Sequence, residues 1–470
     1  MWDFRQFSGR VAAADEWGRT LYYEELEEEN RRFGEALGER SLVFVLCSNT
    51  MGSLAGYTGC INGGSVPLLL ARNLDEELLA GLMEIYRPDY LWVPEELAHR
   101  FEGFAVRYQA FGYVLLGTGY ERGYGLYEEL CLLLTTSGST GSPKLVRQSY
   151  GNVLSNARAI VEYLELDEGE RPITTLPMNY TYGLSIINSH LLVGAEILLT
   201  DKGLMQKDFW TFFKREGATS FGGVPYIYEM LEKLRFFRMD LPSLKTMTQA
   251  GGKLQPELHK RFAEYALEKG KRFYVMYGQA EATARMSYLP YERSLEKYGS
   301  MGIAIPGGRF SVMDVDGKEI TAPDTVGELV YEGPNVTLGY GECREDLAKG
   351  DERHGRLETG DMAKFDSDGY YYIVGRKKRF LKIFGNRVNL DEIDGLVKAR
   401  FGNIDCVSSG RDDELYFFIT EESLQEEVRK FLSHKTGLNS SAFRVRVIAQ
   451  IPRNDSGKVL YQELNRYMEE

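Results

Sequence analysis

Short apolar runs alternate with amphipathic stretches along most of this 470-residue chain. The alternation is typical of strands that are covered on both faces by helices. Apolar and β-branched or aromatic residues cluster in four runs that we expect to be strands: Leu42–Leu46, Leu130–Thr136, Glu196–Thr200 and Arg272–Tyr277. From Asn152 to Leu166, apolar residues recur at three- and four-residue steps, which predicts a helix with one buried face. The first part of the chain is therefore predicted to be α/β.

The pattern changes after about Ala304. Asp316-Gly317 and Asp368-Gly369 each lie between strand-like runs, as hairpin turns do, which predicts an antiparallel, small β-barrel-like section. Beyond Gly375 we expect a helix, a strand, a helix and a strand at Asn389–Arg400, Leu415–Ile419, Ser423–Leu432 and Phe443–Ile448. We place the domain boundary near Lys378. The prediction is a large N-terminal domain, residues 1–377, and a small mobile α+β domain, residues 378–470.

The composition excludes several classes of protein. With 43% hydrophobic and 27% charged residues the chain can bury a large core, unlike a disordered, collagenous or coiled-coil chain. The net charge of −13 opposes binding to nucleic acid or anionic lipid, although residues 378–470 hold fifteen basic and fifteen acidic side chains and are neutral. The five cysteines are scattered, without metal-ligand spacing, and we expect reduced thiols and no disulfides. Neither a secretion signal nor a membrane span is evident, so we expect a soluble cytoplasmic protein.

The strongest local motif is the sequence TTSGSTGSPK at residues 135–144, directly after an apolar run. Backbone N–H groups and hydroxyls of such a loop converge on phosphate oxygens, and Lys144 adds a positive charge. The loop is not a Walker motif, because Pro143 precedes the lysine and Leu145 follows it where a Ser or Thr would hold magnesium. By itself the motif is equally compatible with a Ser/Gly-rich surface turn.

Four further segments occur in order along the chain: YGQAEAT at 277–283, TGD at 359–361, DGYYYIVGRKK at 368–378 and PRNDSGK at 452–458. Together with the 135–144 loop, they closely resemble the motifs of the adenylate-forming ligases. That superfamily includes acyl-CoA synthetases, adenylation domains of peptide synthetases and firefly-type luciferases. The resemblance extends from about Leu130 to Tyr461, whereas the first 129 residues add only a compatible α/β pattern.

The resemblance implies that a carboxylate attacks the α-phosphate of ATP with the help of Mg²⁺. The loop would hold the β- and γ-phosphates through Thr136, Ser137, Gly138, Ser139, Thr140, Gly141 and Lys144. Tyr277 would stack on adenine, while Glu281 and Thr136 would contact Mg²⁺. Further nucleotide contacts would come from Gly251, Gly252, Gly278, Gln279 and the backbone of Ala280. Outside this context, Tyr277 would be read as a core aromatic and Glu281 as a surface acid.

The later motifs supply the other predicted roles. By resemblance, Asp361 accepts from the ribose hydroxyls, Arg376 makes a second ribose or phosphate contact, and Lys458 is the catalytic residue that bridges carboxylate and α-phosphate oxygens. Lys378 occupies the hinge position about which the small domain rotates, so that residues 383–387 line the tunnel of an attacking thiol. Alone, Asp361 would be a turn residue, Lys458 a solvated lysine, and residues 376–379 a basic linker.

Two departures from the family pattern stand out. The family commonly has threonine where this chain has Ala280, so one hydroxyl near the α-phosphate is absent unless Thr283 or water replaces it. The chain is also shorter than many relatives, with the difference expected in its N-terminal part.

The predicted acid pocket has walls of aromatic and small residues, namely Tyr180, Tyr182, Phe221, Tyr226 and Ala250. Thr181 stands where adenylation domains for α-amino acids place an aspartate, so an uncompensated ammonium disfavours that substrate class. An aliphatic, hydroxylated or aryl acid fits equally well. The acceptor is coenzyme A, slightly favoured, or the phosphopantetheine arm of an acyl carrier protein.

Three other functions stay open at this stage. The chain could be a stand-alone adenylation enzyme for an amino acid, or a non-catalytic nucleotide-binding homologue. A luciferase-like oxygenase would use the same adenylate.

Overall fold

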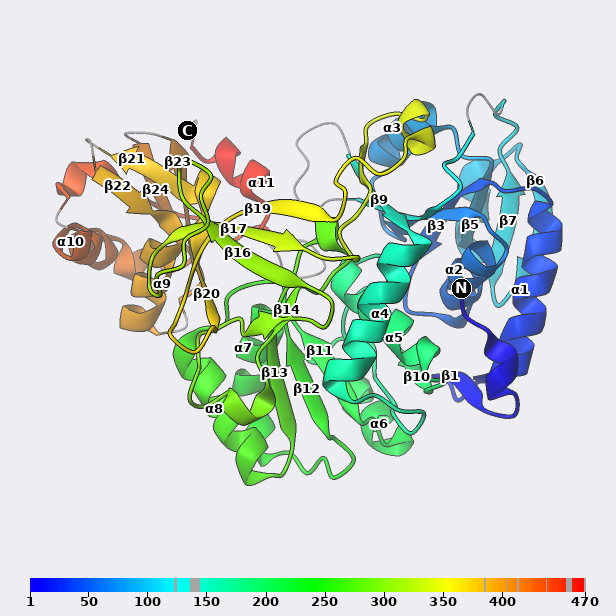
Figure 1. Cartoon of the computed structure of the whole chain (residues 1–470), viewed down its shortest axis with the longest axis horizontal. Coiled ribbons are helices and arrows are strands. Elements are labelled where there is room, and N and C mark those ends of the chain that lie inside the picture. The colour runs from blue at the N-terminus through cyan, green and yellow to red at the C-terminus, as the bar shows by residue number, and fades with distance from the viewer. Residues whose placement is uncertain are drawn as a thin grey trace. The chain divides into compact units, whose positions relative to one another are not determined.

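The computed structural model describes residues 1–121, 125–135, 144–383, 386–402, 404–411, 414–436, 438–453 and 459–468 (Figure 1). The chain divides into two compact units. Unit 1 comprises Met1–Tyr298, Ala304–Arg309 and Glu332–Leu357, and unit 2 comprises Gly299–Ile303, Phe310–Tyr331 and Glu358–Glu470. The α/β fold class is confirmed, and the domain boundary near Lys378 stays a prediction.

The largest described sheet of unit 1 has eight strands in the order β18-β9-β8-β4-β3-β5-β7-β6. Their bounds are β3 (Leu42–Cys47), β4 (Val66–Ala71), β5 (Tyr90–Pro94), β6 (Ala105–Ala110), β7 (Tyr113–Gly117), β8 (Leu130–Thr135), β9 (Leu145–Ser149) and β18 (Gly339–Gly341). The central strands β8, β4, β3 and β5 are parallel. Alternate β3 residues belong to different core clusters, Val43 and Val45 to one, Leu42 and Phe44 to the other, so both faces are covered as predicted.

Helices of unit 1 cover these faces: α1 (Tyr23–Leu37) and α2 (Met51–Asn62) contribute to the cluster of Val43, and α3 (Glu76–Tyr86) to that of Phe44. A second sheet contains β11 (Ser220–Gly223), β12 (Thr246–Gln249), β13 (Arg272–Tyr277), β14 (Ser287–Tyr288) and β15 (Ile303–Ala304). A third contains β1 (Val11–Asp15), β2 (Thr20–Tyr22) and β10 (Ile197–Leu199). The remaining helices are α4 (Tyr150–Leu164), α5 (Thr181–Leu192), α6 (Lys207–Glu216), α7 (Pro225–Lys233) and α8 (Pro256–Glu268). The bounds of β13 match the prediction.

Helix α4 shows why a predicted boundary was wrong by two residues. The Ser149 side chain accepts from the backbone N–H of Asn152, and the Asn152 side chain accepts from the N–H of Ser149, so the helix begins at Tyr150. Its predicted apolar stripe is confirmed, because Val153, Ala157 and Ile160 are buried.

Unit 2 contains the predicted antiparallel section. Strands β16 (Arg309–Met313), β17 (Gly327–Glu332), β19 (Arg356–Phe365) and β20 (Tyr371–Arg376) lie in that order, with no closed barrel among these described strands. The turn at Asp368-Gly369 joins β19 to β20, and Gly369 has a φ of +80°. The rest comprises β21 (Phe380–Ile383), β22 (Asn386–Asn389), α9 (Leu390–Phe401), β23 (Cys406–Arg411), β24 (Glu414–Ile419), α10 (Gln425–Thr436), β25 (Phe443–Val447) and α11 (Tyr461–Arg466), which confirms the predicted alternation.

No helix within the described part of the chain has the length and apolarity needed to cross a bilayer. The five cysteines are free thiols, and four of them are buried.

Arg379 joins three elements in the interior of unit 2. Its Nε donates to Asp391 Oδ1 at 2.5 Å and its Nη2 to Asp394 Oδ2 at 2.8 Å, both on α9. Nη1 donates to the Ser408 carbonyl of β23 at 3.1 Å, and the guanidinium carbon lies 4.8 Å from the ring centroid of Tyr461 on α11. Arg379, the residue after Lys378, is thereby connected to α11, the helix that follows the motif at residues 452–458.

Asp394→Asn should alter how stability depends on pH. Burial raises the pKa of Asp394 to about 6, with Arg379 only partly opposing the effect. The folded protein thus holds this proton more tightly than the unfolded chain, and the contribution of Asp394 to stability falls as pH rises from about 4 to about 6. In thermal unfolding experiments on both proteins, the Tm of the wild type should fall relative to that of the variant over this window. Above about pH 7 the difference between the two Tm values should stay constant. A pH-independent difference would contradict this reading.

Candidate functional site

The segment after β13 folds into a tight, strained turn. A Cβ on Gly278 would lie 1.5 Å from the carbonyl oxygen of Ala284, so only glycine fits. Thr283 and Ala284 have φ values of 53° and 90°, which are rare for residues with a side chain. The turn is held by a hydrogen bond from the Ala284 N–H to the Gln279 carbonyl at 3.2 Å. Strain that the surroundings maintain in this way is typical of functional segments.

Glu281, at the centre of this turn, is fixed at both its side chain and its backbone. The hydroxyl of Tyr340 donates to its Oε1 at 2.7 Å. Its carbonyl oxygen accepts from the N–H and the hydroxyl of Thr337, both at 3.0 Å, and from Arg353 Nη1 at 3.1 Å. No basic side chain in the described residues forms an ion pair with the Glu281 carboxylate, and its contact with Mg²⁺ stays a prediction.

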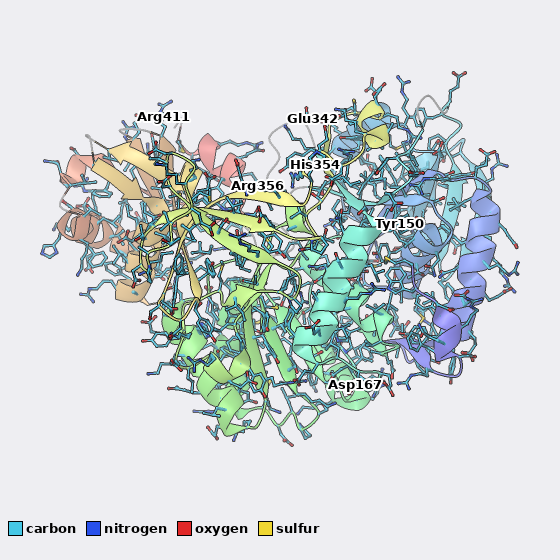
Figure 2. The ribbon with its side chains drawn as sticks, in the orientation of Figure 1. Tyr150, Asp167, Glu342, His354, Arg356 and Arg411 are labelled. Carbon is cyan, nitrogen blue, oxygen red and sulfur yellow. The ribbon has the colours of Figure 1, made fainter. Side chains whose placement is uncertain are left out.

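Two cations lie against the Tyr340 ring. The guanidinium carbon of Arg353 is 4.7 Å from the ring centroid, and Lys144 Nζ is 5.8 Å from it. Lys144 also forms an ion pair with Glu342 at 2.5 Å, and Glu342 is labelled in Figure 2. Burial, and then the charge of Glu281, raise the pKa of Tyr340 to about 12. Its hydroxyl is therefore protonated at neutral pH and serves as the donor to Glu281.

This arrangement fits a magnesium ion that is held mainly by a nucleotide. The described residues contain no cluster of three or more His, Cys, Asp or Glu that could bind a metal ion without help. Mg²⁺ is commonly bound by one or two carboxylates together with substrate phosphates and water. The Glu281 carboxylate, which accepts a hydrogen bond and has no ion pair with a described basic side chain, suits that mode. Lys144 lies close by, with its Nζ against the ring of Tyr340.

The predicted adenine contact lies at the edge of the same turn. The Tyr277 hydroxyl accepts a hydrogen bond from Gln279 Nε2 at 3.1 Å, and its ring is half-buried. Thr283, considered as a replacement for the hydroxyl missing at Ala280, donates its proton to the Asn335 carbonyl at 2.7 Å. Its hydroxyl is thus engaged within the protein.

The predicted acid-pocket residues are only partly brought together. A Cβ on Gly251, which has a φ of +82°, would lie 2.5 Å from the Tyr180 hydroxyl. Tyr182 is buried, and its hydroxyl bonds that of Thr248 at 2.8 Å. Among the other pocket members, Phe221 packs in the core against Phe236, Tyr226 is exposed, and Ala250 follows β12. Their contacts with an acid stay predictions. Gly251 and Gly252, the predicted nucleotide contacts, come directly after Ala250.

Asp361 and Arg376 face each other across β19 and β20 of unit 2. They are paired in the strand register, and Arg376 Nε lies 3.4 Å from Asp361 Oδ1. The Asp361 side chain is 6% exposed and that of Arg376 56% exposed. The pair presents an acceptor and a donor together, as ribose recognition requires, and its role stays a prediction.

Several predicted residues lie outside the described residues: Thr136, Ser137, Gly138, Ser139, Thr140, Gly141 and Lys458. Lys378 belongs to a 3₁₀ segment, Lys377–Arg379. The roles assigned to all of them stay predictions.

Sequence reasoning missed Tyr340 and Arg353. They lie 59 and 72 positions from Glu281, so no local spacing links them to it. The one available signal was the triplet Gly339-Tyr340-Gly341, which places an aromatic residue between two glycines.

Comparisons with known proteins show what the chain is similar to. The model of the AMP-binding enzyme family matches residues 125–341. A 2-succinylbenzoate–CoA ligase of Bacillus mycoides is 28% identical over 443 residues, which cover 91% of this chain and 89% of that protein. An oxalate–CoA ligase of Arabidopsis thaliana is 29% identical over 342 residues, 70% of this chain and 65% of that protein.

Solved structures show the same fold. The O-succinylbenzoate coenzyme A synthetase of Bacillus subtilis in complex with AMP has a TM-score of 0.79 at 21% identity, with 98% of this chain and 97% of that chain covered. The same enzyme in complex with ATP and magnesium ion has a TM-score of 0.75 at 22% identity, with 98% of each chain covered.

Tyr340→Phe should weaken the binding of a divalent cation with nucleotide by about 10- to 100-fold, because the carboxylate of Glu281 loses the group that orients it. Calorimetric titration of ATP at several Mg²⁺ concentrations would measure this effect. Tyr86→Phe is a matched control, since the Tyr86 hydroxyl donates to the Gly341 carbonyl at 2.8 Å, beside Tyr340, without contact to Glu281. Equal Mg²⁺ dependence in both variants would contradict the orienting role of Tyr340.

Proposed function

We propose that this chain, which matches the model of the AMP-binding enzyme family over residues 125–341 and is similar to named CoA ligases, is an ATP-dependent acid–thiol ligase that forms an acyl-adenylate and then a thioester of coenzyme A. The observation that carries the proposal is the convergence on Tyr340. There the carboxylate of the Tyr277–Thr283 motif and the lysine of the phosphate-loop motif meet one side chain.

In the first half-reaction, an oxygen of the acid attacks the α-phosphorus of ATP, the bond to the bridging oxygen breaks, and pyrophosphate leaves. Negative charge grows on the phosphate oxygens, so fixed cations lower the barrier. Lys144 would exchange Glu342 for phosphate oxygens, and Glu281, whose carboxylate Tyr340 orients, would hold the Mg²⁺ ion. When bound, Mg²⁺ neutralises part of the phosphate charge. Lys458 is proposed to bridge the attacking carboxylate and the α-phosphate.

In the second half-reaction, a thiolate attacks the acyl carbon and AMP leaves with the bonding electron pair. We assign the change between the two reactions to rotation about Lys378, after which the backbone near residues 383–387 approaches the adenylate. Asp361 and Arg376 are proposed to hold the ribose of the nucleotide, as their pairing across two strands permits.

Coenzyme A is the preferred acceptor because the named relatives are CoA ligases. The phosphopantetheine of an acyl carrier protein offers the same thiol and is the second acceptor to test. The relatives are named for 2-succinylbenzoate and for oxalate at nearly equal identity, so identity by itself does not select the acid of this chain.

The central test is pyrophosphate release from ATP across aliphatic, aryl, dicarboxylic and amino acids, with and without coenzyme A. At least one acid should give acid-dependent release and a CoA thioester. Lys458→Ala should lower acid-dependent pyrophosphate exchange by at least about 100- to 1,000-fold while ATP binding persists. ATP binding without acid-dependent release in the wild type would favour a non-catalytic homologue, and wild-type exchange in the variant would remove Lys458 from catalysis.

Lys378→Pro should separate the two half-reactions. Proline fixes φ near −65° and also restricts the preceding residue, so it limits a rotation centred here. Thioester formation should slow by at least about tenfold more than adenylate formation, both measured in single-turnover assays. The neighbouring Lys377→Ala removes a surface ion pair with Glu328 and serves as the control. Equal slowing of both steps in Lys378→Pro would argue against the hinge.

A further inference from the structure

Arg353 is a half-buried cation beside the proposed metal ligand. Its Nη1 donates to the Glu281 carbonyl at 3.1 Å and to the Thr337 hydroxyl at 3.2 Å. Its guanidinium carbon lies 4.7 Å from the ring centroid of Tyr340. All three partners are neutral groups, and no carboxylate in the described part of the chain forms an ion pair with Arg353. Its charge is therefore held in position without being neutralised there.

Lys144, the other cation on the Tyr340 ring, is held differently. Its Nζ lies 5.8 Å from the ring centroid and pairs with the carboxylate of Glu342 at 2.5 Å. An incoming anion has to displace Glu342 before it pairs with Lys144. The same anion can pair with Arg353 without displacing any carboxylate of the described residues. Of the two cations, Arg353 thus has the more available charge.

The guanidinium of Arg353 also has donors to spare. Its hydrogen bonds to Glu281 and Thr337 both come from Nη1, which leaves Nε and Nη2 for an acceptor. Arginine binds phosphate oxygens through such paired donors. Burial and the charge of Glu281 raise the pKa of Tyr340 to about 12, and the positive charge of Arg353 opposes this rise. The charge of Arg353 is therefore felt at the hydroxyl that orients the Glu281 carboxylate.

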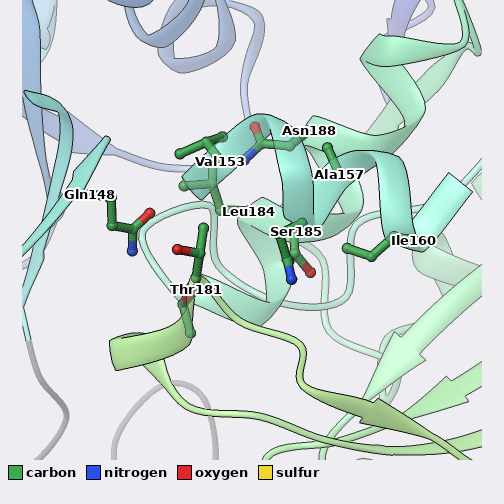
Figure 3. Close-up of a pocket in the computed structure, with 10 residues that line it drawn as sticks. Gln148, Val153, Ala157, Ile160, Thr181, Leu184, Ser185 and Asn188 are labelled. Carbon is green, nitrogen blue, oxygen red and sulfur yellow. The ribbon is translucent and has the colours of Figure 1, made fainter. Parts of the chain in front are cut away.

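A described cavity next to the same turn is too small for phosphate groups. It lies between α4 and α5 and is lined by Thr283 of the turn together with Gln148 and Ser185 (Figure 3). The cavity has room for about one water molecule. We therefore expect a phosphate chain to approach the turn where Glu281 and Tyr340 meet the two cations, rather than through this cavity.

We propose that Arg353 is a second phosphate-binding cation, which contacts the β- and γ-phosphates of ATP together with Lys144. The inference rests on the proposed function, in which the lysine of the loop meets the same phosphates. Negative charge moves onto pyrophosphate as its bond to the α-phosphorus breaks, so a fixed cation at that place stabilises the transition state. Tyr340 makes the arrangement possible, because its ring contacts Arg353 and its hydroxyl orients Glu281.

The test compares the binding of ATP with that of AMP, which lacks the β- and γ-phosphates, by calorimetric titration at saturating Mg²⁺. Arg353→Gln removes the charge but keeps an amide that can donate to the Glu281 carbonyl. This variant should bind ATP at least about tenfold more weakly and AMP with nearly the wild-type affinity, because only ATP loses a charge-assisted contact. Arg353→Lys keeps the charge without the fork and should lie between the wild type and Arg353→Gln.

Two control variants separate phosphate binding from support of the turn. Thr337→Val removes the hydroxyl that donates to the Glu281 carbonyl and keeps the charge of Arg353, so ATP and AMP should weaken by similar factors. Arg356→Gln removes a cation three positions further on, which is exposed, pairs with Glu332 at 2.8 Å and is labelled in Figure 2. It should change neither affinity. Equal weakening of ATP and AMP in Arg353→Gln, or no weakening of either, would overturn the proposal.

The outcomes also distinguish this inference from the proposed function. If Arg353→Gln does not fold, the ratio of ATP to AMP affinity in Arg353→Lys decides. That ratio should fall by at least about threefold because a single ammonium replaces the fork, and an unchanged ratio would overturn the proposal. A wild type that shows the Arg353 effect but releases no pyrophosphate with any acid would overturn the ligase function alone. A wild type that binds no ATP would overturn both.

Discussion

The contact between Gly278 and the Ala284 carbonyl is the constraint on which the rest of the site depends. Because the backbone closes on itself there, no side chain is tolerated at residue 278, and Thr283 and Ala284 are held at positive φ. The turn directs Tyr277, Glu281 and Arg285 from nine consecutive residues into separate environments. A regular helix or strand would place these side chains at fixed spacings and could not direct all three into separate environments.

The surroundings of Glu281 explain how a turn with strained backbone keeps a single conformation. Three donors saturate the Glu281 carbonyl, and two of them come from Thr337. Tyr340, only three residues further on, orients the carboxylate. One short segment therefore fixes both the backbone and the side chain of the proposed metal ligand, and the cations on the Tyr340 ring bring positive charge to the same place without neutralising that carboxylate.

The sequence predicted helices and strands well where interactions between residues close in the chain determine their bounds. Strand β13 has the predicted bounds because an apolar run ends at a glycine, whereas α4 begins two residues early because Ser149 and Asn152 form a reciprocal cap that apolar periodicity does not detect. Tyr340, Arg353 and Arg285 could not be predicted from spacing. Tyr340 and Arg353 reach Glu281 from distant segments of the chain. Arg285 is unusual because it is buried without a carboxylate partner among the described residues, and the sequence does not show which residues surround it.

Arg379 and Arg285 are both surrounded by protein atoms, but the charges of their guanidinium groups are accommodated by different kinds of partner. Arg379 is surrounded by Asp391, Asp394, a carbonyl and an aromatic ring, so its charge is balanced within unit 2 and its contribution is to bind elements together. Arg285 has hydroxyls, a thioether and a ring, which solvate a cation without balancing it. A guanidinium can therefore be buried in two ways, beside carboxylates that balance its charge or among oriented neutral groups and a ring that solvate it.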